Sequence, residues 1–305
     1  MIHSRFVWSS IALLAVGLLV GCGEAGSPPP GATSTTSPAQ VELGNDAQAQ
    51  ESGAAAAPAA VPETKTALAE GELATLTGRI VYDGKPPASK PVQATKDVEV
   101  CGKHEIPDET LQVSKDGGLA DAVVSLKTKN VPAAPSYAAT ANEPVVLDNK
   151  DCRFQPHVAI ILTSQELQLK NSDPVGHNSK MDPFKNLPIN PILPAGGEPT
   201  KYKFKDEEGV PVKVGCNIHP WMGAYLIVRK DPYAAITDKD GKFTIKDLPA
   251  GKELEFHLWQ ESAGHLKNAA YKGGKAGTNG RFKIKLKPGV NDLGDIKVSA
   301  STFKK

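Results

Sequence analysis

The feature that most constrains the fold of this chain is a series of short strand-like runs that begins after about residue 75. The runs are rich in β-branched residues or alternate apolar with polar positions, and Gly, Pro or Asp separates them. No window of helical length combines a 3.6-residue apolar period with capping residues. The predicted strands are 76–82, 122–126, 158–162, 167–171, 202–204, 212–214, 225–228, 243–245, 254–259, 282–286 and 296–298. The pattern predicts an all-β sandwich or barrel, with at most one or two helical turns near residues 181–187.

The N-terminus has the pattern of an export signal. His3 and Arg5 precede an apolar run over residues 6–19, which is shorter than a membrane-spanning helix requires. The small residues before Cys22 resemble the lipobox of bacterial lipoproteins, and this resemblance implies cleavage after residue 21 and lipidation of Cys22. An ordinary signal peptide that contains a cysteine is the alternative. We expect acyl chains to hold the protein on a membrane of the bacterial cell envelope, with its body in the periplasm or at the cell surface. Gly23 favours the outer membrane.

Residues 22–74 are predicted to form a disordered tether. The segment is rich in Ala, Pro, Ser, Thr and Gly and has no sustained apolar period, so it cannot bury enough surface to offset its ordering entropy. The whole chain has a formal net charge of +1, which argues against a nucleic-acid partner. The folded part is therefore expected to begin near residue 75.

Residues able to bind a metal concentrate in two turns. Cys216, His219 and Met222 place a thiolate, an imidazole and a thioether within seven residues, between two predicted strands. His177 adds a second imidazole in a polar turn further upstream. Two His, one Cys and one weakly bound Met form the ligand set of a type 1 copper site. The spacing therefore predicts one copper ion as cofactor.

This ordered set resembles the cupredoxins, and the Cys-x2-His-x2-Met loop is similar to that of the amicyanin type. The resemblance implies a Greek-key sandwich over residues 146–230 and one-electron transfer to a redox protein whose identity the sequence does not give. It also implies that Asn178 helps to hold the ligand loops together and that His219 is the ligand at the solvent edge. Pro220 and Trp221 would then form an apolar docking surface, although Trp221 is equally consistent with a core position under the loop.

Two other functions fit the same residues. Zinc also binds Cys and His, but a Met as fourth donor is unusual in a structural zinc site. The loop is alternatively vestigial, in a non-catalytic adhesion or carbohydrate-binding lipoprotein, although no residue pattern supports carbohydrate directly. No acid/base pair or Ser/His/Asp order is evident, so we expect a protein that is not an enzyme.

Cys101 and Cys152 are the remaining cysteines. In an oxidising cell envelope a disulfide between them is the simplest interpretation. The alternatives are free thiols, or a second metal site formed by Cys101, His104, Cys152 and His157.

The C-terminal part, residues 231–305, has a different pattern. An Asp-Gly turn at residues 238–241 lies between two runs and predicts a β-hairpin. Together with Leu248 and Pro249, the turn resembles the carboxypeptidase regulatory-like, or transthyretin-like, β-sandwich module. The start of the N-terminal β segment, residues 75–145, weakly resembles the first strand of the same module.

Overall fold

The computed structural model describes residues 73–88 and 90–303. Cys22, the predicted signal peptide and the predicted tether up to residue 72 lie outside the described residues. The all-β prediction is confirmed: the helical elements of the described part are α1 (Val98–Cys101) and two 3-10 turns, Pro135–Tyr137 and Ala300–Thr302. None of the helices in this part of the chain has the length and apolar character needed to span a bilayer.

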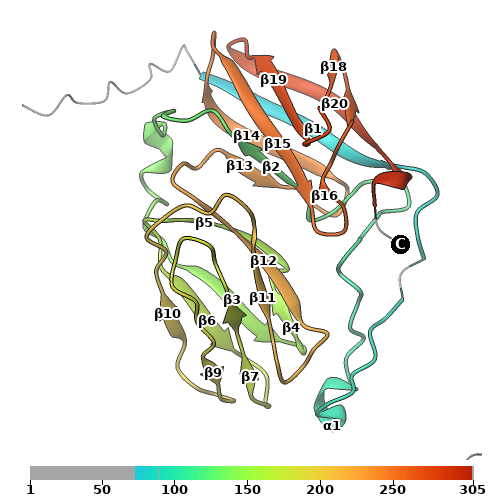
Figure 1. Ribbon diagram of the computed structural model, residues 1–305, viewed down its shortest axis with the longest axis vertical. Coiled ribbons are helices and arrows are strands. Elements are labelled where there is room, and N and C mark those ends of the chain that lie inside the picture. The colour runs from blue at the N-terminus through green and yellow to red at the C-terminus, as the bar shows by residue number, and fades with distance from the viewer. Residues whose placement is uncertain (1–72, 89, 304–305) are drawn as a thin grey trace, which may run out of the picture. The chain divides into compact units, whose positions relative to one another are not determined.

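Strands from both ends of the described chain form one sandwich, which we call the terminal sandwich (Figure 1). One sheet has the order β14 (Lys242–Pro249), β1 (Leu73–Asp83), β20 (Gly289–Ser299), β17 (Ala270–Tyr271) and β18 (Gly274–Lys275). The other has the order β13 (Ala234–Ile236), β2 (Val123–Leu126), β15 (Glu253–Gln260) and β16 (Gly264–His265), with β19 (Arg281–Lys285) also paired to β15. A single core fills the space between them, with Leu76, Tyr233 and Phe256 fully buried. The N-terminal β segment and the C-terminal segment therefore share both sheets.

The intervening chain forms a second sandwich, the central sandwich. Its first sheet has the order β10 (Thr200–Tyr202), β6 (Leu167–Asn171), β3 (Val145–Lys150) and β4 (Arg153–Gln155). The second has the order β5 (Val158–Leu162), β12 (Gly223–Arg229), β11 (Val212–Gly215) and β8 (Lys180–Met181). A short pair, β7 (His177–Asn178) and β9 (Ile192–Leu193), lies at one end. Leu147, Phe154 and Leu169 are fully buried in its core.

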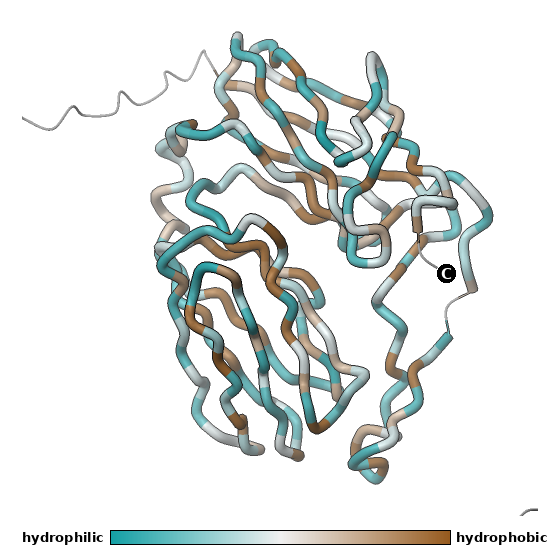
Figure 2. Tube along the Cα trace, viewed as in Figure 1, coloured by the Kyte–Doolittle hydropathy of each residue, from teal (hydrophilic) through white to brown (hydrophobic). Residues whose placement is uncertain are grey.

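Strand β12 has both faces buried because it separates two apolar clusters. Leu226 and Val228 point into the core of the central sandwich. Ile227 instead packs with Val123 and Trp259 of the terminal sandwich. Figure 2 shows the resulting continuous hydrophobic stretch along this strand and the neighbouring β5. Such a run lacks the alternation of a strand that has one face in water.

Three local predictions are wrong. The expected helical turns at residues 181–187 are absent, since Met181 is in β8, paired with Val214, and forms a bridge to Ile189. The strand expected at 202–204 lies instead at Thr200–Tyr202. The turn at Asp238 forms, with Gly241 at a φ of 80°, but the strands on its two sides do not make a hairpin. Strand β13 pairs with β2 and β14 pairs with β1, so the turn carries the chain from one sheet to the other.

A long connection between β1 and β2, residues 84–122, departs from both sandwiches and returns. We call it the covering loop. Figure 1 shows it as the teal to green segment that carries α1 toward the end of the central sandwich where β7 and β9 lie. The loop positions residues 97–110 against the predicted metal-binding turns.

Candidate metal centre

The residues predicted as ligands meet at one end of the central sandwich. His177 begins β7, and Cys216 follows β11 directly. Strands β11 and β12 are paired as far as Gly215 and Gly223, so residues 216–222 form the closing loop of a hairpin. Within this loop the His219 amide N–H donates to the Cys216 Sγ at 3.4 Å, and the Met222 amide N–H donates to the His219 carbonyl at 2.9 Å. These hydrogen bonds within the loop hold Cys216, His219 and Met222 close together.

Three donor atoms converge in the interior. The Cys216 Sγ lies 4.0 Å from His177 Nδ1 and 3.7 Å from His219 Nδ1, and the two Nδ1 atoms are 2.9 Å apart. With bonds of about 2.0 Å to nitrogen and about 2.3 Å to sulfur, one ion can reach donors up to roughly 4 Å apart. All three separations fall within that reach. The donors His177, Cys216 and His219 are buried, and both imidazoles have no exposed surface.

The hydrogen bonds of the two rings fix which nitrogens face the centre. His177 Nε2–H donates to Asp173 Oδ2 at 2.9 Å, and His219 Nε2–H donates to Asp97 Oδ2 at 2.8 Å. Because a carboxylate only accepts, both Nε2 atoms carry the proton and both Nδ1 atoms present lone pairs to each other. Two lone pairs at 2.9 Å require a shared cation, either a proton or a metal. The donor set therefore fits a bound metal ion.

The pKa values of the Cys216 thiol and the His177 ring are shifted in opposite directions, as in a buried thiolate–imidazolium pair. Burial would raise the pKa of the Cys216 thiol, but hydrogen bonds from His177, Asn178 and His219 outweigh it and lower the pKa to about 6. Burial would lower the pKa of His177, but the contacts with Asp173 and Cys216 raise it to about 9. In the metal-free protein a thiolate and a shared imidazole proton therefore stand where a cation would bind.

Asn178 ties the upstream turn to the ligand loop. Its Oδ1 accepts from the Asn217 amide at 2.8 Å and from the Ile218 amide at 3.4 Å, and it lies 3.4 Å from the Cys216 Sγ. Its Nδ2 donates to Asn190 Oδ1 at 2.5 Å. Asn178 thus contacts the ligand loop in the way the sequence resemblance implied.

Met222 is buried in the same apolar cluster as Cys216. The backbone also links the two residues, since the Cys216 amide donates to the Met222 carbonyl at 3.4 Å. Its thioether belongs to the core that surrounds the three donors.

The expectation that His219 lies at the solvent edge is wrong. Its ring is fully buried beneath the covering loop, whose Asp97 occupies the Nε2 side. Trp221 packs on the ring with centroids 5.0 Å apart, and its Nε1–H donates to the Cys152 carbonyl at 3.0 Å. Of the two residues predicted to form a docking surface, Pro220 is exposed, whereas Trp221 is half-buried between the ligand loop and the covering loop.

Cys101 and Cys152 are joined in a disulfide bond that anchors the covering loop to the turn between β3 and β4. Neither sulfur is then a thiolate, so the alternative second metal site is wrong. His104 lies 3.7 Å from an oxygen of Asp151 through its Nδ1. His157 belongs to a separate ionic cluster.

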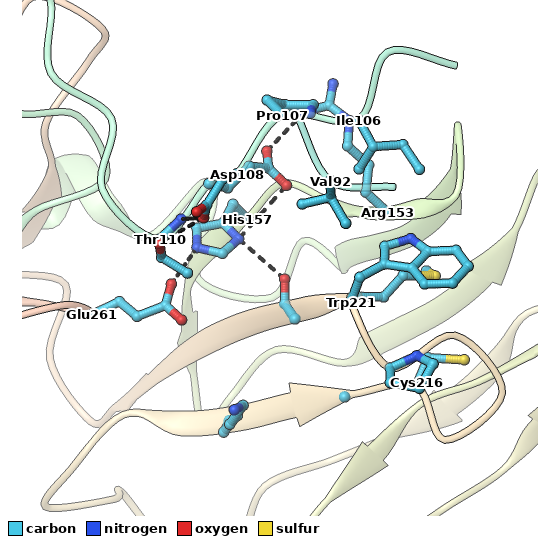
Figure 3. A pocket seen from close by; sticks show the side chains of 16 residues that line it. Val92, Ile106, Pro107, Asp108, Thr110, Arg153, His157, Cys216, Trp221 and Glu261 are labelled. Carbon is cyan, nitrogen blue, oxygen red and sulfur yellow. Dashed lines mark hydrogen bonds and ion pairs between the residues drawn. The ribbon is translucent and has the colours of Figure 1, made fainter. Parts of the chain in front are cut away.

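A cavity of about 340 Å³ separates that cluster from the ligand loop (Figure 3). His157 Nε2 contacts Glu261 at 2.7 Å, and its Nδ1 contacts the Gly223 carbonyl at 3.1 Å. Figure 3 shows Trp221 and Cys216 on the other side of the cavity from His157 and Glu261. Both ring nitrogens of His157 are engaged, so the ring acts as a bridge between sheet and loop.

Both carboxylates that orient the imidazoles, Asp173 and Asp97, are absent from the residues predicted from sequence. Asp173 lies four residues before His177 in the same polar turn, a spacing that makes it findable from sequence. Asp97 lies 122 residues before His219, and no local pattern connects the two.

Comparisons with known proteins find likeness to copper proteins over part of the chain. No protein-family model matches the chain, and no curated protein matches it. A purple cupredoxin from Nitrosopumilus maritimus is 22% identical with a TM-score of 0.23, over 28% of this chain and 98% of that one. A reduced amicyanin variant is 14% identical with a TM-score of 0.26, over 35% of this chain and 98% of that one. Part of the chain is thus similar to cupredoxins.

A copper-containing nitrite reductase from Thermus scotoductus is 23% identical with a TM-score of 0.26, over 28% of this chain. The match covers 22% of the reductase chain. At these TM-scores the likeness carries no argument about the site, and the fit of His177, Cys216 and His219 to a metal ion rests on their donor geometry alone.

Proposed function

We propose that this protein binds one type 1 copper ion through His177, Cys216 and His219, with Met222 as a weak axial ligand, and that it carries single electrons. The observation that supports this most strongly is the convergence of the His177 Nδ1, His219 Nδ1 and Cys216 Sγ atoms within reach of one ion. Copper held by two imidazoles and a thiolate changes oxidation state with little rearrangement of its ligands.

The chain's own residues supply a rigid frame for that exchange. Asp173 fixes the orientation of His177, and Asn178 holds the ligand loop against the upstream turn. Cys216 and Met222 belong to the apolar core of the central sandwich, and both imidazoles are buried. A frame fixed in this way is typical of a carrier, since it lowers the reorganisation that each electron transfer requires.

The location and partner are parts of the same proposal. A lipid anchor at Cys22 would hold the body at the cell envelope, most simply on the outer membrane, with a redox protein as its partner. We propose a carrier rather than an enzyme.

Zinc is the second candidate, because the same three donors suit it. The buried thioether of Met222 beside them favours copper, since a soft sulfur donor suits copper better than it suits structural zinc.

The test uses the full chain, purified without metal and then titrated with Cu(II). We expect an intense thiolate-to-copper absorption band in the red part of the visible spectrum at one copper per chain. Cys216→Ala should abolish the band, whereas the matched control Met222→Leu should retain it with a shifted maximum. A colourless protein that retains one zinc would support the second candidate. Failure to bind either metal would overturn both and leave the vestigial loop as the better interpretation.

A further inference from the structure

The far side of the His219 ring is closed by a residue from a distant part of the chain. Asp97 Oδ2 accepts the His219 Nε2 hydrogen at 2.8 Å, and the ring has no exposed surface although the Asp97 side chain itself is 42% exposed. The carboxylate therefore stands between the imidazole edge and the solvent.

The covering loop that carries Asp97 is anchored at several points. The disulfide from Cys101 holds it four residues after Asp97. Ile106 packs in a buried cluster with the disulfide and Trp221. Further along the loop, Glu109 pairs with Arg153 at 2.8 Å. Asp97 is thus held in place by tertiary contacts on its C-terminal side.

The backbone at Asp97 is specialised as well. Its φ and ψ of 45° and 44° lie in the left-handed region, and its carbonyl accepts from the amides of Val100 and Cys101 at 2.9 and 2.8 Å. A residue with a β-carbon adopts this conformation rarely, although Asn and Asp do so more readily than most and Gly does so freely. The local turn therefore directs the carboxylate at His219, and it permits substitution by Asn or Gly without backbone strain.

We propose that Asp97 is a positioning residue that fixes the His219 ring, keeps a negative charge on its outer nitrogen and closes this edge to redox reagents. The inference rests on the proposed copper site. A carboxylate hydrogen-bonded to a ligand imidazole makes the ring a stronger donor, and its charge favours the more positive oxidation state. Asp97 therefore lowers the reduction potential and slows electron exchange through the imidazole edge.

Two substitutions of Asp97 distinguish the effect of its negative charge from the effect of its side chain covering the His219 ring. Asp97→Asn keeps an oxygen that can accept from Nε2 but removes the charge, and Asp97→Gly removes both while keeping the turn. Glu99→Gln is the matched control, because Glu99 is an exposed carboxylate on the same short helix. We expect all three copper-loaded variants to retain the blue band.

The expected results differ between the variants. Asp97→Asn should raise the midpoint potential and leave the rate of electron exchange with hexacyanoferrate close to that of the unmodified protein. Asp97→Gly should raise the midpoint potential and lower copper affinity by about tenfold. It should also increase the rate of electron exchange with hexacyanoferrate by more than Glu99→Gln changes it. If Glu99→Gln shifts the potential as much as Asp97→Asn, or if Asp97→Gly leaves the exchange rate unchanged, the positioning role is overturned.

A second measurement does not depend on copper. In the metal-free chain, ¹⁵N-resolved NMR should show the His219 Nε2 hydrogen protected from exchange with water, and Asp97→Gly should abolish this protection while Glu99→Gln preserves it. Protection without a blue band would contradict the proposed function but support the positioning role. Free exchange in the unmodified protein would overturn the positioning role alone.

Discussion

Asp173 and His177 form a buried pair in which one carboxylate oxygen, Asp173 Oδ2, accepts the imidazole Nε2 hydrogen at 2.9 Å. The same carboxylate accepts from the amides of Asp151 at 2.7 Å and Cys152 at 2.9 Å. Burial would raise the pKa of Asp173, but these hydrogen bonds outweigh it and lower the pKa. The pair links the disulfide-bearing turn directly to a metal donor.

Replacing this carboxylate should weaken metal binding. In Asp173→Asn the amide group cannot accept three hydrogen bonds as the carboxylate does, so His177 loses its fixed orientation. We expect metal affinity to fall about 10- to 100-fold, measured by competition titration against a chelator. Asp148→Asn is the control, because the Asp148 carboxylate accepts hydrogen bonds from Ser172, the residue next to Asp173, and forms no hydrogen bond with His177. Equal affinities for the two variants would contradict this role.

Removing the Asn178 side chain should destabilise the metal-free protein. Asn178→Ala removes the acceptor of the Asn217 amide, and a hydrogen bond of this kind contributes about 0.5–1.5 kcal/mol of unfolding free energy. Chemical denaturation of the metal-free chain measures the loss. Asn190→Ala removes only the partner of the Asn178 Nδ2 group and should cost less. The prediction fails if Asn190→Ala is the more damaging change.

The disulfide should stabilise the fold by reducing the conformational entropy of the unfolded chain. Cys101 and Cys152 are 51 residues apart, and a closed loop of that length corresponds to about 4 kcal/mol of unfolding free energy. We expect the double substitution of both residues by Ala to lose most of this, as measured by denaturant unfolding. Cys216→Ala is the control, because it removes a buried sulfur that forms no cross-link. A similar loss in the control would show that packing, and not the cross-link, provides the stability.

His157 should make stability depend on pH. Burial would lower its pKa, but the hydrogen bond and charge of Glu261, with Glu109 and Asp121, outweigh burial and raise it. A raised pKa stabilises the folded state fully below the unfolded value of about 6.5, and this contribution is lost as pH rises through the folded pKa. The difference in unfolding free energy between the unmodified protein and His157→Gln should therefore be largest just below the unfolded His pKa of about 6.5, where the neighbouring carboxylates still carry charge, and should shrink as pH rises through the folded pKa. Glu261→Gln should flatten the same dependence; a difference that grows toward alkaline pH would refute the assignment.

Local pattern was sufficient for several strands. Strands β5 and β6 match their predicted ranges because alternation or β-branched enrichment between turn residues marks both ends. Strand β3 was missed, since Val145–Lys150 contains Asp and Asn in the middle of its run. Asn149 is buried nevertheless and donates to the Lys170 carbonyl, so a tertiary partner compensates for its poor strand propensity.

The sequence by itself determined that His177, Cys216 and His219 are the candidate donors, because the ligand types and the loop spacing are local properties of the chain. Only the tertiary structure decided that His219 is covered. Asp97 reaches it across 122 residues, through a loop whose path depends on a disulfide and an apolar cluster formed with the central sandwich. Contacts of this range leave no periodicity in the sequence, since they arise from packing between elements and not from the pattern within any one of them.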